Sequence, residues 1–123
     1  MQLELEKPDT PIYVKHYQKG QISLPEKTYT HSLIFTPDRL INDNWPVTDC
    51  GNLNLESLAL MLDSAYEVFL LGSGNVPAIP SQAVIQAFAR IGKTLDFMDS
   101  SAACRTFNIL ANEGRRVIAG IIV

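Results

Sequence analysis

Residues 68–74 read Val-Phe-Leu-Leu-Gly-Ser-Gly, and this short run sets the expected architecture. Four apolar residues in a row, closed by Gly72, are typical of a strand that is covered on both faces of its sheet. Further strands of one sheet are expected at Leu95–Met98 and Val117–Val123. Because the segments between these runs have helical spacing, we expect parallel strands joined by right-handed helical crossovers.

Three segments place apolar residues at helical spacing, and each follows a residue suited to begin a helix. We expect helices near 55–62, 81–91 and 101–112, beginning at Asn54, at Pro80-Ser81 and at Ser100 or Ser101. Gly92 and Gly114 then stand where helices commonly stop.

The first half of the chain has the texture of antiparallel strands and loops. Residues 12–17 have the two-residue periodicity of a half-buried strand. Lys19-Gly20 can then turn the chain into a second strand at residues 22–24. Residues 32–35 predict a third strand, and the polar stretch 38–52 predicts a long irregular crossing. The expected fold class is α/β, with N-terminal antiparallel hairpin elements followed by α-β-α-β-α-β with parallel strands, as a single domain over residues 1–123.

Charge and composition exclude several function classes. Ten Lys and Arg against thirteen Asp and Glu give a net charge of −3, which argues against nucleic acid as a partner. Cys50 and Cys104 form no metal-binding spacing with His16 and His31, so we expect two unbonded thiols, no metal and no cofactor. The first nine residues lack a signal-peptide core, and no apolar run approaches the ~20 residues that span a bilayer. These features predict a cytoplasmic protein that does not cross a membrane.

The glycine run Gly72-Ser73-Gly74 is the first candidate site. Two glycines after a strand let the backbone approach a ligand, and the following helix offers free N–H groups to an anion. It resembles half of a dinucleotide fingerprint, but Pro77 stands where the third glycine would be. The alternative interpretation is a tight turn from strand to loop.

The stretch from Asp99 to Asn108 is the second candidate site. Asp99 and Gly72 each follow a strand of the same parallel sheet, so they should meet at its carboxyl edge. Ser101, Arg105 and Asn108 are spaced to share a polar stripe, or else Asp99 caps the helix and pairs with Arg105 while Asn108 satisfies a loop. A helix start and the neighbouring arginine could activate Cys104 as a nucleophile, although a free cysteine is usually a small buried apolar residue.

Residues 70–74, together with 97–110 and Glu113-Gly114-Arg115, resemble the Mth-type domain family, whose members include mitochondrial assembly factors of the respiratory NADH dehydrogenase, complex I. Tyr29, Ser32-Leu33-Ile34, Pro37 and Trp45 also match that family. The resemblance implies a three-layer mixed β/α fold, the Mth-like fold, without enzymatic activity.

The resemblance also bears on the two candidate sites. The family's loop commonly reads Gly-Thr-Gly with a basic or aromatic residue before the later proline, whereas here Ala78-Ile79 precedes Pro80. This difference weakens an anion site at the loop, and the set Asp99, Cys104, Arg105 and Asn108 matches the family better.

Two functions follow as expectations. The first is a non-enzymatic accessory or assembly protein that contacts protein partners, including membrane-complex subunits, with Trp45 either covering the core edge or marking the partner surface. The second is a small-ligand or anion-binding protein, or an unrecognised enzyme, that uses the loop with Arg105 and Asn108. Self-association stays open.

Overall fold

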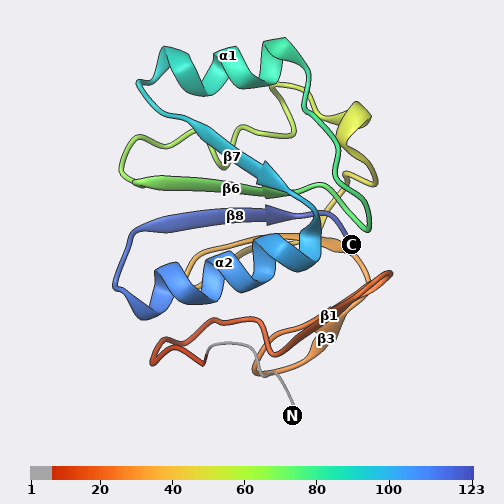
Figure 1. Cartoon of the computed structure of the whole chain (residues 1–123), viewed down its shortest axis with the longest axis vertical. Helices are drawn as coiled ribbons and strands as arrows, with labels where there is room; N and C mark the ends of the chain where they lie inside the picture. The colour runs from red at the N-terminus through yellow and green to blue at the C-terminus, as the bar shows by residue number, and fades with distance from the viewer. Residues whose placement is uncertain (1–6) are drawn as a thin grey trace.

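The computed structural model describes residues 7–123, so that the first six residues of the N-terminal segment lie outside the described part. The chain builds a five-stranded mixed sheet in the order β5-β4-β8-β6-β7 and a small antiparallel sheet in the order β1-β2-β3 (Figure 1). In the large sheet β6 runs parallel to β7 and β8, while β4 runs antiparallel to β5 and β8. The strands are β1 His16–Gln18, β2 Gln21–Ser23, β3 Thr28–Tyr29, β4 Ser32–Phe35, β5 Leu40–Trp45, β6 Val68–Gly72, β7 Leu95–Met98 and β8 Val117–Ile121. The helices are the 3-10 turn η1 Cys50–Asn52, α1 Gln82–Arg90 and α2 Ser100–Asn112.

The second half of the chain confirms the predicted alternation of strands and helices. The three apolar runs are neighbouring strands, and the segments between them are α1 and α2. Ser81 caps α1 by accepting a hydrogen bond from the Val84 N–H. Gly92 and Gly114 follow the two helices with φ of +74° and +75°, the left-handed conformation that glycine adopts without strain.

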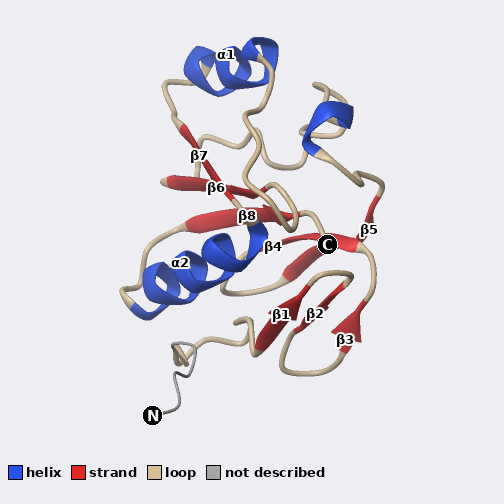
Figure 2. Cartoon of the chain, turned by 45° about the vertical axis from the view of Figure 1, so that its right-hand side comes forward, coloured by secondary structure: helices blue, strands red, loops and turns tan. Residues whose placement is uncertain are grey.

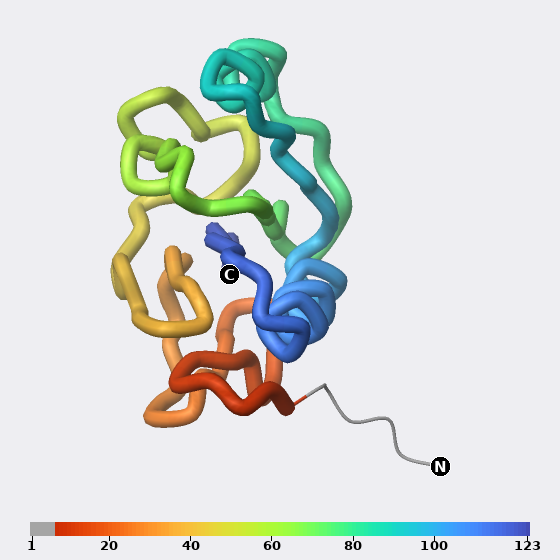
Figure 3. Tube along the Cα trace, turned by 90° about the vertical axis from the view of Figure 1, so that its left-hand side faces the viewer, coloured from red at the N-terminus to blue at the C-terminus, as the bar shows by residue number. Residues whose placement is uncertain are grey.

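The large sheet is covered on both faces, which explains its apolar strands. Figure 3 shows three layers: α1 with the 50–62 segment above, the sheet in the middle, and α2 with the small sheet below. Side chains alternate between two buried clusters, so that Phe69 and Leu71 pack in one layer and Leu70 in the other. Figure 2 shows α1 and α2 on opposite sides of the sheet. One cluster includes Phe88 of α1, and the other includes Phe107 of α2.

Two predictions about the first half were wrong. Residues 55–62 form successive turns and not an α-helix, because their backbone bonds mix three- and four-residue spacing and only Leu58 and Met61 are fully buried. The polar stretch expected to be irregular contains β5, which pairs with β4 through its backbone with register irregularities. The predicted N-terminal hairpin is present but shorter, and β3 adds a strand that the sequence did not predict.

Trp45 covers the core and is not an exposed partner surface. Its side chain is 3% exposed, and its indole N–H donates to the carbonyl of Ser57 at 2.8 Å. The ring lies against Gly120 in β8, where a Cβ would come within 2.8 Å of the indole. Glycine at this position therefore makes room for the tryptophan.

Candidate functional site

The glycine loop after β6 is closed by hydrogen bonds from its own neighbourhood. The Ser73 N–H donates to the carbonyl of Met98 at 2.8 Å, and its hydroxyl donates to the Val76 carbonyl at 2.8 Å. The Gly74 N–H donates to the hydroxyl of Ser100 at 2.9 Å, and the Ser100 N–H donates to the Gly74 carbonyl. The N–H groups of Ser73 and Gly74 are thus engaged within the protein.

Ser100 is the residue that joins this loop to the rest of the sheet edge. It is fully buried, and its hydroxyl also donates to the carbonyl of Ile122 at 2.6 Å, just after β8. A Cβ on Gly72 would lie 2.9 Å from the Ser100 Cα, which explains why glycine stands there. The sequence indicated Ser100 only as a candidate cap. Since Asp99 takes that role, Ser100 is free to bridge β6 and β8.

The predicted polar stripe on α2 is divided between two environments. Asp99 caps the helix by accepting from the Ala102 N–H at 3.0 Å. Arg105 is exposed and donates to the Ser101 hydroxyl at 2.8 Å, one turn back on the same helix, and not to Asp99 as one of the two interpretations predicted. Asn108 faces the interior with no exposed surface. A single stripe of Ser101, Arg105 and Asn108 is therefore not formed.

Asn108 forms hydrogen bonds with backbone groups of a loop, which one of the two interpretations of the sequence predicted. Its side-chain oxygen accepts from the Val14 N–H at 2.9 Å, and its amide donates to the Val14 carbonyl at 2.8 Å. Both bonds are buried and connect residues 94 positions apart. The amide group thus attaches the segment before β1 to α2.

Cys104 is a buried residue of the core on the side of α2. Its side chain is 1% exposed, and burial raises the pKa of its thiol far above the ordinary value. The charge of Arg105 acts in the opposite direction but is the smaller effect. Cys50 is also buried, and both thiols are unbonded as predicted.

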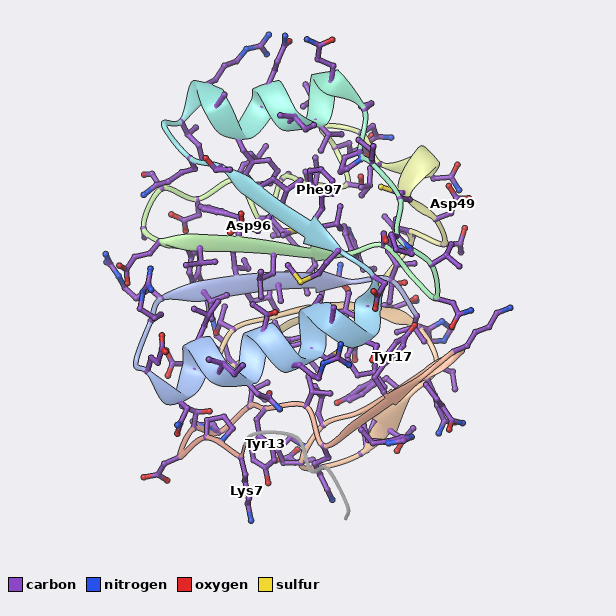
Figure 4. All side chains as sticks on the ribbon, viewed as in Figure 1. Lys7, Tyr13, Tyr17, Asp49, Asp96 and Phe97 are labelled. Atoms are coloured by element: carbon purple, nitrogen blue, oxygen red, sulfur yellow. The ribbon has the colours of Figure 1, made fainter. Side chains whose placement is uncertain are left out.

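Tyr17 lies over the start of α2 and was not among the predicted site residues (Figure 4). Its hydroxyl is buried near Ser100, but no group within residues 7–123 meets the geometry of a hydrogen bond to it. Desolvation raises the pKa of this phenol more than the nearby Ser100 side chain lowers it. No sequence signal distinguishes this tyrosine from its neighbours in an alternating strand.

Two grooves lie away from the glycine loop. A groove of about 590 Å³ runs between β7 and α2, and another of about 330 Å³ lies near Arg115 and Arg116. The Glu67 carboxylate forms ion pairs with both arginines, 3.8 Å from Nε of Arg115 and 3.6 Å from Nε of Arg116. Its hydrogen bond from the Arg116 N–H, with the two arginine charges, lowers the pKa of the Glu67 carboxyl.

The chain has the fold of a Mth938-like domain. A solved structure from Bordetella pertussis, described as a Mth938-like domain, matches 98% of this chain and 91% of its own with a TM-score of 0.77. Its identity is 23%, so this likeness concerns the fold. A structure from Xanthomonas campestris matches all of this chain and 92% of its own, at 35% identity and a TM-score of 0.82.

The chain belongs to the family of proteins of unknown function DUF498/DUF598, whose match covers residues 14–122. It is 34% identical to the 13 kDa major membrane protein of Francisella tularensis subsp. holarctica (strain LVS), over 99% of both chains. It is 27% identical to mouse NADH dehydrogenase (ubiquinone) 1 alpha subcomplex assembly factor 3, over 90% of this chain and 60% of that protein. Within residues 7–123, no helix has the length and apolar character needed to cross a bilayer.

Proposed function

We propose that this protein is a non-enzymatic accessory factor that binds protein subunits during the assembly of a membrane complex. The observation that carries this proposal is the similarity to the NADH dehydrogenase assembly factor over 90% of the chain. The chain spans 60% of the mouse factor, so the partner must be sought directly and not carried over. The proposed site of action is the cytoplasmic side, where unbonded cysteines such as Cys50 and Cys104 persist.

The geometry gives less support to a ligand-binding role of the glycine loop. An anion at this loop would need free N–H groups, whereas those of Ser73 and Gly74 already have acceptors. Asn108 is occupied by Val14, and Cys104 is buried with a raised thiol pKa. These contacts favour a packing role for the loop and leave protein contact as the better-supported function.

The proposal is tested by capture with crosslinking. The chain, carrying an affinity tag and expressed at its natural level, is crosslinked in its own cells, and the captured proteins are identified by mass spectrometry. Cells that express the chain without the tag serve as the control. We expect defined subunits of a membrane complex that are captured before that complex is complete. Recovery of only mature complexes, or of the same proteins with the control, contradicts the proposal.

A further inference from the structure

β7 is an open edge of the large sheet. It pairs with β6 on one side, and no described strand lies on the other. The Met98 carbonyl accepts from the Ser73 N–H and so points toward the β6 side. Because peptide groups alternate in direction along a strand, the N–H and C=O of Phe97 point outward, away from β6. The edge thus offers main-chain donors and acceptors to a further strand.

The surfaces beside this edge are suited to side chains of an added strand. On the face of α2, the groove of about 590 Å³ is bordered by Met98, Thr106 and Leu110. Phe97 also borders this groove, and because side chains alternate along a strand it projects to the opposite face of β7, where it is 36% exposed. Figure 4 shows Phe97 and Asp96 on β7 without a ribbon in front of them.

Two charged side chains, Asp96 and Arg115, line the groove, and Asp96 is its carboxylate. Asp96 is exposed and forms no ion pair with any residue in the described range. Arg115 at the same groove is already engaged by Glu67. A basic side chain on an added strand would therefore find a free carboxylate.

We propose that β7 takes an extended segment of a protein partner as a sixth strand, with apolar side chains in the groove and a lysine or arginine toward Asp96. This inference rests on the proposed function, for which it names the binding surface. Addition of a strand to an exposed sheet edge is an established way of binding peptides. A second copy fits less well, because a two-fold pairing of β7 with itself brings two Asp96 carboxylates to the same face near the axis.

The experiment uses the full chain and a short blocked peptide that alternates valine and threonine and carries one central lysine. Amide hydrogen exchange is followed by NMR with and without saturating peptide. We expect the Phe97 amide to exchange roughly ten-fold more slowly with peptide, since it gains an acceptor. The same peptide with N-methyl groups on its strand-facing amides should give no protection. Asp96→Asn should weaken binding by roughly two- to five-fold, as for an exposed ion pair.

Three results would overturn the inference. The first is a Phe97 amide whose exchange does not change, and the second is equal protection by the N-methylated peptide. The third is a chain that sediments as a dimer with its Phe97 amide already protected, which would assign the edge to a second copy. Phe97→Pro removes both the outward N–H and the exposed ring, and it separates the two proposals in the capture experiment. If a folded Phe97→Pro chain still captures the subunits, the partner does not bind at β7, while the proposed function stands. If the wild-type chain captures none, the proposed function fails.

Discussion

Truncation of Asn108 to alanine should be among the most damaging single changes in α2. The side chain is fully buried and holds both the N–H and the carbonyl of Val14, at 2.9 and 2.8 Å. Asn108→Ala leaves these two main-chain groups without partners inside the protein. Each such group costs about 1–3 kcal/mol, so the free energy of unfolding should fall by about 2–6 kcal/mol. At roughly 4 °C per kcal/mol for a domain of this size, the melting temperature should fall by about 8–24 °C.

Thermal and urea unfolding, followed by circular dichroism, measure this loss. The matched control is Arg105→Ala on the same helix, where an exposed guanidinium donates to the nearby Ser101 hydroxyl. Its effect should stay within about 0.5 kcal/mol. Hydrogen exchange should also show faster exchange of the Val14 amide in Asn108→Ala. An Asn108→Ala protein as stable as the control would refute the claim that this amide attaches the N-terminal segment.

Three further predictions concern the sheet edge, the thiols and the response to acid. Gly72→Ala should destabilise the protein by about 1–3 kcal/mol, because its Cβ would lie 2.9 Å from the Ser100 Cα, and unchanged urea unfolding would show that the loop is not tightly packed. Cys104 should react with a thiol reagent only after unfolding, because it is 1% exposed and its pKa is raised, and rapid labelling of the native protein would contradict this. Glu67 has a lowered pKa in the folded protein, so its contribution is present above the ordinary value of 4.5 and is lost as the pH falls through the folded pKa. Melting curves of Glu67→Gln and wild type should therefore differ at neutral pH and converge in acid, and a difference that persists in acid would count against this linkage.

The elements that the sequence predicted well are those whose local pattern and tertiary environment agree. The strands β6, β7 and β8 follow apolar runs, and the helices between them follow Ser81 and Asp99 with glycines at their ends. The segment 55–62 has helical spacing but is too short to be stable as a helix without more buried residues. Its Leu55 and Leu60 are each 51% exposed, so the packing that would stabilise a helix is missing.

The candidate site depended on contacts that a local pattern does not contain. The sequence correctly predicted that the glycine loop and Asp99 lie at the carboxyl edge of the sheet, because parallel strands end on the same side. The pairing of Asn108 with Val14, and of Ser100 with Ile122, spans 94 and 22 positions and leaves no periodic signal. The strand β5 was missed for a similar reason, since an edge strand pairs through its backbone and tolerates polar residues such as Asn42 and Asp43.

Removal of the chain from its own cells tests the assembly role most directly. Membranes from cells with and without the chain are separated on native gels, and the respiratory NADH dehydrogenase is located by its activity and by the mass spectrometry of each band. We predict fewer mature complexes and an accumulation of partly assembled subunits, both corrected when the wild-type chain is restored. Mature complexes in unchanged amount, with no partly assembled species of any membrane complex, would contradict the role proposed for this protein.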